Sequence, residues 1–189
     1  ASEGYPRQAL GTLPTGTRGA LGTAGERVRT FQPAAMPKGW HDDERHYGEL
    51  VTPVKRVGAY VPGGTAPLAS TVIMTVVPAR VAGVDEVYLT TPAAGDALPH
   101  PAVLASAAIS GVDRVFKVGG AQAIAAFAYG TETVPAVDLI VGPGNVWVTA
   151  AKCQLFGRVG IDGMYGPTET LVVADETSDP EFCASDLLA

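Results

Sequence analysis

Three glycine-rich segments carry the residue types that a ligand site needs. They read Tyr60-Val-Pro-Gly-Gly-Thr65, Gly119-Gly-Ala-Gln122 and Gly142-Pro-Gly-Asn145. Glycine lets a backbone approach a ligand closely, and the start of a following helix presents free N–H groups and a partial positive charge to an anion. None has the G-x-G-x-x-G spacing of the dinucleotide fingerprint, so for any one of them alone a tight turn is the better explanation. Their recurrence in one chain favours a cleft for a cofactor.

Other polar residues give weaker signals. His41 and His46 are five residues apart, which does not put two imidazoles on one face of a helix. We therefore interpret residues 41–46 as a solvated, charged turn rather than a metal site. His100 lies between two prolines with no evident partner, and Asp162 is as well suited to fixing a turn as to contacting a ligand. No spacing assigns a Ser-His-Asp or Cys-His constellation.

The elements that must position the glycine segments alternate along the chain. Runs rich in β-branched and aromatic residues predict strands over residues 54–61, 86–91, 114–118, 138–141 and 170–174. Apolar or alanine-rich runs, several of them followed by glycine, predict helices over residues 69–81, 101–110, 122–129, 146–156 and 180–188. This alternation predicts an α/β, Rossmann-like fold with a mostly parallel sheet and helices on both faces. Ligands of such sheets gather beyond the carboxyl ends of the strands, where the three segments fall.

The first part of the chain differs from this pattern. Glycine and proline interrupt every helical stripe over residues 1–23, which predicts a flexible arm that contributes little to the core. Residues 24–50 form a lead-in with a short helix that ends before Pro33. The predicted division is therefore a flexible arm and lead-in over residues 1–50 and a Rossmann-like domain over residues 51–189.

Composition limits the classes of partner. The chain of 189 residues is 47% hydrophobic, which suits one globular domain with a core. A net charge of −6 without a cluster of Lys and Arg argues against nucleic acid, and no apolar run reaches the roughly 18 residues of a membrane helix. Cys153 and Cys183 lack C-x-x-C spacing, so we expect free thiols and a reducing, cytoplasmic compartment.

Longer blocks of sequence, in the same order, resemble histidinol dehydrogenase. They are Arg56-Val-Gly-Ala-Tyr-Val-Pro-Gly-Gly-Thr-Ala66, Val118-Gly-Gly-Ala-Gln-Ala-Ile-Ala-Ala126, Gly130-Thr-Glu-Thr-Val-Pro135, Val141-Gly-Pro-Gly-Asn145, Ile161-Asp162, Gly166-Pro-Thr-Glu169 and Ala184-Ser-Asp-Leu-Leu188. The resemblance covers about residues 54–189 and extends weakly back to residue 25. It does not cover the first two dozen residues.

The resemblance implies an NAD-dependent enzyme. Histidinol dehydrogenases oxidise L-histidinol to L-histidine through an aldehyde, the last steps of histidine biosynthesis, on a zinc-bearing homodimer. By motif, Tyr60, Gln122 and Asn145 fall on NAD-binding positions, and we expect them to approach one another. Thr168 falls on a substrate-contacting position that is usually serine. On residue type alone, Tyr60 also suits the core, Gln122 and Asn145 suit helix caps, and Thr168 suits a turn.

Two departures from the family pattern leave alternatives open. Tyr165 stands where the family usually has a small residue, so a related NAD-dependent dehydrogenase of another small alcohol, such as a sulfonated diol, remains an alternative. The family's zinc ligands and its Glu-His pair for proton transfer are expected beyond Ala189. We therefore assign no catalytic or metal residue, expect the 189-residue chain alone to be inactive, and keep a non-catalytic remnant of the fold as a further alternative.

Overall fold

The structure is a computed structural model that describes residues 4–63, 67–95, 97–165 and 169–188. The elements, in chain order, are α1 (Tyr5–Thr12), α2 (Thr15–Ala35), β1 (Trp40–Asp42), β2 (Tyr47–Glu49), β3 (Arg56–Tyr60), α3 (Ala69–Val81), β4 (Glu86–Thr90), α4 (Pro101–Ser110), β5 (Arg114–Phe116), α5 (Gly120–Tyr129), β6 (Leu139–Val141), α6 (Val146–Leu155), β7 (Gly160–Ile161) and α7 (Pro180–Leu188).

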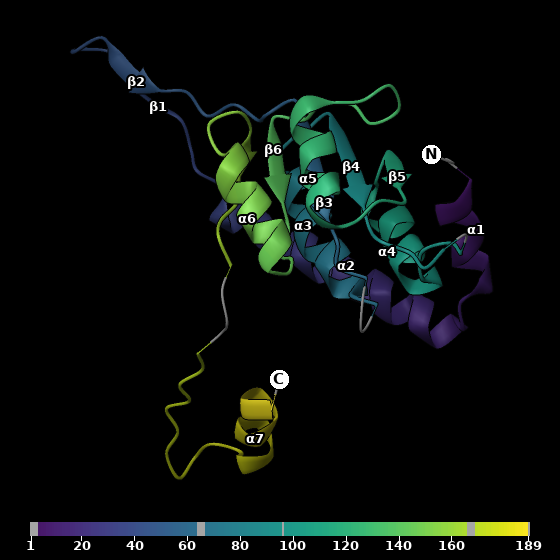
Figure 1. Ribbon diagram of the computed structural model, residues 1–189. Helices are drawn as coiled ribbons and strands as arrows, with labels where there is room; N and C mark the ends of the chain where they lie inside the picture. The colour runs from purple at the N-terminus through teal and green to yellow at the C-terminus, as the bar shows by residue number, and fades with distance from the viewer. Residues whose placement is uncertain (1–3, 64–66, 96, 166–168, 189) are drawn as a thin grey trace.

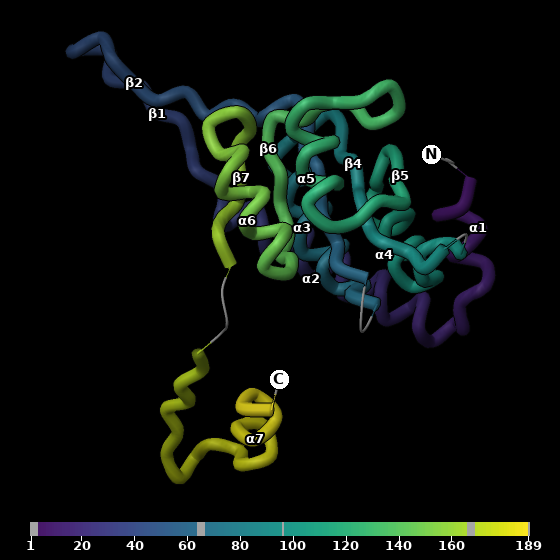
Figure 2. The backbone as a smooth tube through the Cα atoms, viewed as in Figure 1, coloured from purple at the N-terminus to yellow at the C-terminus, as the bar shows by residue number. Residues whose placement is uncertain are grey.

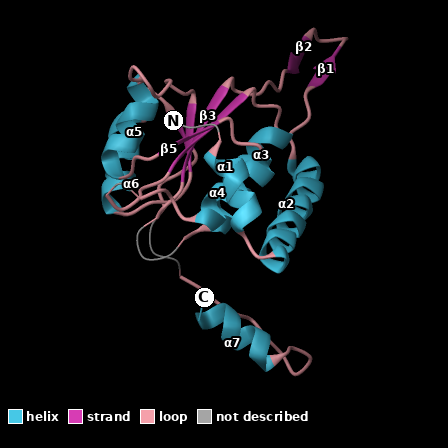
Figure 3. Ribbon diagram, turned by 90° about the vertical axis from the view of Figure 1, so that its right-hand side faces the viewer, coloured by secondary structure: helices cyan, strands magenta, loops and turns pink. Residues whose placement is uncertain are grey.

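A five-stranded parallel sheet forms the centre of the molecule. The strand order is β5-β4-β3-β6-β7. The chain enters this sheet at β3, continues outward through β4 to β5, and then returns to add β6 and β7 on the other side of β3. Helices α3 and α4 lie on one face, and α5 and α6 lie on the other (Figures 1 and 3). The predicted Rossmann-like α/β fold is confirmed, and the strand order reverses between β3 and β6.

The core has two halves because successive strand residues point to opposite faces of the sheet. Val57 and Ala59 of β3 pack with residues of α3 and α4, whereas Tyr60 packs with residues of α5 and α6. Gly58 faces α5: a Cβ built at this position would come within 2.6 Å of the Phe127 ring. The small residue in β3 therefore lets a large aromatic side chain lie directly on the strand.

Most predicted elements lie where the sequence places them, but one strand does not. The predicted strand over residues 170–174 is wrong, because these residues pair with no strand in the described part of the chain. Leu171 and Val173 are 87% and 89% exposed, and α7 lies apart from the sheet (Figure 1, yellow). The fifth strand is instead the short β7, which pairs with β6. A β-rich run forms a strand only when a neighbouring strand completes its hydrogen bonds.

The predicted arm also has a different structure. Residues 5–12 form α1 and residues 15–35 form α2, so the expected absence of helix over residues 1–23 is wrong where the chain is described. The predicted end of a helix before Pro33 is also wrong, because Pro33 lies inside α2. Helix α1 packs against α4, where Ala9 is buried beside Leu104 and Ala105. A glycine in a helix costs roughly 0.5–1 kcal/mol, and tertiary packing routinely outweighs such propensities. Nothing in the structure tests the predicted division at residue 50.

Residues 41–46, predicted to form a charged turn, lie in a small hairpin that projects from the sheet domain (Figure 2). Residues 43–46 form its turn. β1 and β2 pair antiparallel, and the Asp42 carboxylate accepts hydrogen bonds from the N–H groups of Glu44 and Arg45. These bonds, those from Arg45 above all, lower the pKa of Asp42. The predicted charged turn is confirmed, while the flanking strands were not predicted. Among the residues described, no group of three or more His, Cys, Asp and Glu side chains could hold a metal ion, and no helix is long and apolar enough to cross a membrane.

Candidate functional site

The three glycine segments follow β3, β5 and β6, so they lie at the same edge of the parallel sheet. The strand order reverses between β3 and β6. In an open α/β sheet this reversal separates the loops on either side and leaves a crevice at the carboxyl ends of the strands. Architecture alone therefore places a candidate ligand site between the segments that begin at Tyr60 and Gly142.

Tyr60 connects the first segment to the second. Its ring is buried among residues of α5 and α6, as the core alternative predicts. Its hydroxyl oxygen accepts a hydrogen bond of 3.1 Å from the Gly120 N–H at the start of α5. Gln122 lies two residues further on and is exposed. The side chain of Tyr60 thus fixes the position of the segment that carries Gln122.

Gly142 connects the first segment to the third. Its φ of +110° lies in the region that favours glycine, and a Cβ there would come within 2.1 Å of the Tyr60 carbonyl oxygen. No other residue type fits this position without moving β3 or the loop. The backbones of the first and third segments are therefore in direct contact, and Tyr60 is a neighbour of both other segments.

Asn145 begins α6 and caps it. Its Oδ1 accepts hydrogen bonds of 3.1 Å from the N–H groups of Trp147 and Val148. This is the capping role that the sequence leaves open as an alternative. The side chain is exposed, and its amide nitrogen has no hydrogen-bond partner within the residues that are described. Capping by the oxygen leaves the amide N–H groups available to a ligand.

An ion pair between a buried lysine and a partly exposed aspartate lies directly behind the third segment. Lys152 of α6 is 2% exposed, and its Nζ donates a hydrogen bond of 3.0 Å to the Gly142 carbonyl and pairs with the Asp162 carboxylate. Asp162 follows β7 and accepts a 2.7 Å hydrogen bond from the Gly142 N–H and a 3.0 Å bond from the Tyr165 hydroxyl. Burial, together with the bond to Asp162, raises the pKa of Tyr165. Both polar groups of Gly142 are therefore bound by the same pair of side chains.

An apolar groove of about 740 Å³ begins at this network. Gly142, Pro143, Asp162 and Tyr165 line one end, and residues of α3, β3, β6 and the segment before β3 line the rest. The groove runs along α3, which lines it together with Val57 of β3 and with Leu139 and Val141 of β6. A mostly apolar cavity with a few polar groups at one end is typical of a small-molecule site.

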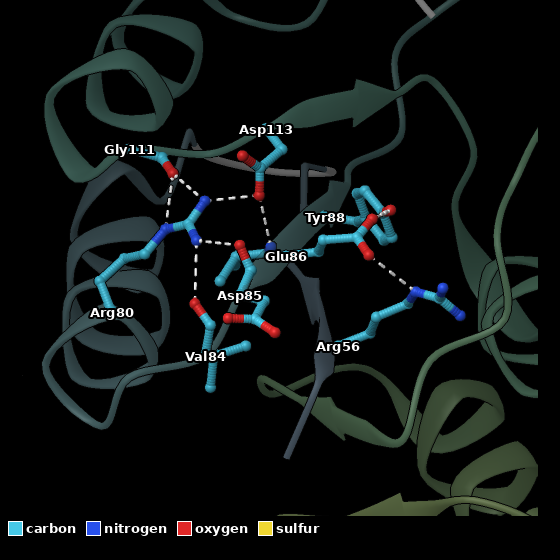
Figure 4. A network of polar contacts seen from close by, with 9 residues as sticks. Arg56, Arg80, Val84, Asp85, Glu86, Tyr88, Gly111 and Asp113 are labelled. Atoms are coloured by element: carbon cyan, nitrogen blue, oxygen red, sulfur yellow. Dashed lines mark hydrogen bonds and ion pairs between the residues drawn. The ribbon is translucent and has the colours of Figure 1, made fainter. Parts of the chain in front are cut away.

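A second polar network lies at the opposite, amino ends of the strands (Figure 4). The Arg80 guanidinium of α3 donates hydrogen bonds to the carbonyls of Gly111, Val84 and Asp85, and it pairs with Asp113. The Asp113 carboxylate also accepts from the N–H of β4 at Val87. These contacts join the ends of α3 and α4 to the start of β4.

Arg56, Glu86 and Tyr88 extend the polar contacts at the amino edge (Figure 4). The Arg56 guanidinium lies 3.0 Å from the Glu86 carboxylate, which also accepts a hydrogen bond from the Tyr88 hydroxyl. The bond from Tyr88, and then that from Arg56, lowers the pKa of Glu86. Because ligands of such sheets bind at the carboxyl edge, this network serves the fold rather than the site.

Comparison with known proteins identifies the family. The family model described as histidinol dehydrogenase matches residues 2–189. The chain belongs to the histidinol dehydrogenase family. It is 54% identical over 172 residues to the histidinol dehydrogenase of Deinococcus radiodurans and 50% identical over 198 residues to that of Thermus thermophilus. The alignments cover 90% and 99% of this chain, but only 39% and 47% of those two proteins.

A solved structure agrees with this assignment. The crystal structure of histidinol dehydrogenase from Elizabethkingia anophelis has a TM-score of 0.88 and 36% sequence identity to this chain. The match covers all of this chain and 44% of that chain. The present chain therefore spans less than half the length of these histidinol dehydrogenases.

Family membership confirms the resemblance carried by the motifs. The expectation that the resemblance leaves out the first two dozen residues is wrong, because the family model matches from residue 2. The roles of individual residues stay predictions. The predicted NAD positions lie at the carboxyl edge: Tyr60 ends β3, whereas Gln122 and Asn145 follow β5 and β6. Thr168, the predicted substrate contact of the histidinol dehydrogenase motif, lies outside the described residues. Lys152 was missed by the sequence analysis. It shares the buried face of α6 with Val148, four residues earlier, and a lysine at that spacing is the signal that could have found it.

Proposed function

We propose that this chain forms the NAD-binding part of a histidinol dehydrogenase, which oxidises L-histidinol to L-histidine in two NAD-dependent steps, the last of histidine biosynthesis. Its membership of the family and the names of its relatives support this activity. The observation that carries the cofactor assignment is the position of Tyr60. Its hydroxyl accepts from Gly120 and its backbone touches Gly142, so it joins the three glycine segments at the reversal of the strand order.

The residues at this edge fit a dinucleotide. The exposed amides of Gln122 and Asn145 stand in the first turn of α5 and at the start of α6, where hydrogen bonds to ribose or phosphate oxygens are available. The Tyr60 hydroxyl fixes the start of α5 by accepting the hydrogen bond from the Gly120 N–H. When bound, NAD would supply the hydride acceptor, one NAD for the alcohol and a second for the aldehyde after water has added to it. Within this chain, we assign Tyr60, Gln122 and Asn145 to binding and orientation of that cofactor.

Zinc does not fit the described part of the chain. No group of three or more metal-ligating side chains occurs there, so we derive no step through the metal. We propose that the zinc ligands and the acid–base residues lie in the part of the relatives' length that this chain does not span. We further propose that the whole protein takes a small-molecule substrate, is a cytoplasmic homodimer, and has no nucleic-acid or membrane partner.

A second candidate is a related dehydrogenase that oxidises another small alcohol, such as a sulfonated diol. Tyr165 favours this alternative, because a bulky phenol stands at the end of the groove where the motif resemblance implies a small residue. Comparing NADH formation from histidinol and from a sulfonated diol by the whole protein, with and without Tyr165→Ala, separates the two substrates. The first function predicts turnover of histidinol, and the second predicts turnover of the diol.

Calorimetric titration of the 189-residue chain with NAD tests the cofactor assignment. We expect saturable binding that Gln122→Ala weakens. Arg80→Met is the matched control because Arg80 lies at the opposite edge of the sheet, so NAD affinity should be unchanged. Absence of binding by the wild-type chain, or equal weakening by both substitutions, would contradict the assignment.

A further inference from the structure

The ion pair of Lys152 and Asp162 binds both polar groups of one peptide. The Lys152 Nζ donates to the Gly142 carbonyl at 3.0 Å, and the Asp162 carboxylate accepts from the Gly142 N–H at 2.7 Å. The two side chains also pair with each other. Lys152 comes from α6 and Asp162 follows β7, so residues from two elements converge on the first residue of the Gly142–Asn145 segment.

Stability alone does not account for a lysine at this position. Lys152 is 2% exposed, and the Asp162 side chain is 18% exposed. Removing the Lys152 charge from water has a desolvation cost, and a well-packed apolar residue often replaces a buried charge of this kind without loss of stability. The pair does determine geometry, because two charged groups of opposite sign hold the N–H and the carbonyl of one glycine in fixed directions.

The glycine needs this support more than an ordinary loop residue does. Its φ is +110°, and its backbone lies so close to the Tyr60 carbonyl that no Cβ fits. Pro143, Gly144 and Asn145 follow directly, and Asn145 begins α6. A rotation at Gly142 would therefore redirect the segment that carries the exposed Asn145 amide.

We propose that Lys152 and Asp162 are positioning residues for the nucleotide site. They hold the Gly142–Asn145 segment in the orientation that binds NAD, and they do so from behind the loop without contacting the cofactor. The proposal rests on the proposed NAD-binding function. It assigns a role to a buried lysine that neither the glycine motifs nor the residue types at the surface indicate.

Lys152→Met combined with Asp162→Asn tests the proposal in the 189-residue chain. The double variant leaves no unpaired buried charge, and asparagine keeps an oxygen that can accept from the Gly142 N–H. Methionine leaves the Gly142 carbonyl without this donor, so we expect the thermal midpoint to fall by no more than that of Arg80→Met. The dissociation constant for NAD should rise about tenfold or more, because the segment loses its fixed orientation. Amide hydrogen exchange should become faster over residues 142–145, measured at Gly142, Gly144 and Asn145, since Pro143 has no N–H.

Arg80→Met provides the control for general destabilisation. Arg80 makes a comparable set of polar contacts at the opposite edge of the sheet, so this variant should unfold more easily and still bind NAD with wild-type affinity. A double variant with wild-type NAD affinity and wild-type exchange over residues 142–145 would overturn the proposal. So would equal weakening of NAD binding by Arg80→Met.

Failure of the proposed function gives a different result. If the wild-type chain does not bind NAD, the cofactor assignment fails, and the exchange measurement alone decides the role of the ion pair. Faster exchange confined to residues 142–145 in the double variant would then support positioning of the segment. Unchanged exchange would refute it.

Discussion

Asn145 has two tasks that two substitutions separate. Its side-chain oxygen caps α6 by accepting from two backbone N–H groups at 3.1 Å, and we propose that its amide nitrogen donates to NAD. Asn145→Ser keeps an acceptor oxygen at the start of the helix but removes the amide. Asn145→Ala removes both. The two variants therefore differ only in the cap.

The expected magnitudes follow from these contacts. Serine caps helices about as well as asparagine, whereas alanine at such a position lowers the free energy of unfolding by about 1 kcal/mol. A hydrogen bond to a charged group contributes about 1.5–3 kcal/mol, which corresponds to roughly 10-fold to 100-fold in affinity. Both variants of Asn145 should therefore bind NAD more weakly by at least about tenfold, and only the alanine variant should also be less stable.

Urea unfolding followed by circular dichroism measures the first effect, and calorimetric titration with NAD measures the second. A serine variant that binds NAD as tightly as the wild type would refute the role of the amide. An alanine variant as stable as the wild type would instead refute the capping argument. If the serine variant is as unstable as the alanine variant, the separation of the two tasks fails.

Four further predictions follow from other parts of the molecule. Gly58→Ala places a Cβ within 2.6 Å of the Phe127 ring, so urea unfolding should show a loss of about 1–3 kcal/mol, and wild-type stability would contradict the packing argument. Arg80→Met leaves several carbonyl groups without their donor and should cost about 1–3 kcal/mol, whereas Arg80→Lys should cost less. Because the Glu86 pKa is lowered in the folded state, its contribution to stability is present above the ordinary glutamate pKa of about 4.3 and is lost as the pH falls through the folded value. Glu86→Gln should therefore make stability less sensitive to acid below that pH, and an unchanged pH profile would count against the network. The 189-residue chain should form no NADH from histidinol, NAD and zinc, because His100 is the only histidine in residues 51–189. Positioned acid–base groups raise the rate of such a reaction by roughly 10²–10⁴-fold. Turnover at the rate of a full-length relative would contradict this prediction.

The alternation of strands and helices could be predicted from the sequence because it depends on local patterns. Helices α3, α4 and α7 have the predicted bounds, since apolar composition and the residues that end them act within a few positions. The three glycine segments were also placed correctly after strands. The N-terminal helices were not predicted, because α1 owes its place to packing against α4, which lies about 90 residues away in the chain.

Residue types and spacing thus determined the fold class, the family resemblance and the edge of the sheet that carries the candidate site. Only the tertiary structure decided which groups meet there. Tyr60 reaches Gly120, and Lys152 and Asp162 converge on Gly142, through contacts between elements that are distant in sequence or joined across the sheet. Local propensity contains no information about such contacts. They arise because strand order brings the carboxyl ends of β3, β6 and β7 side by side, and because buried charges must find partners there.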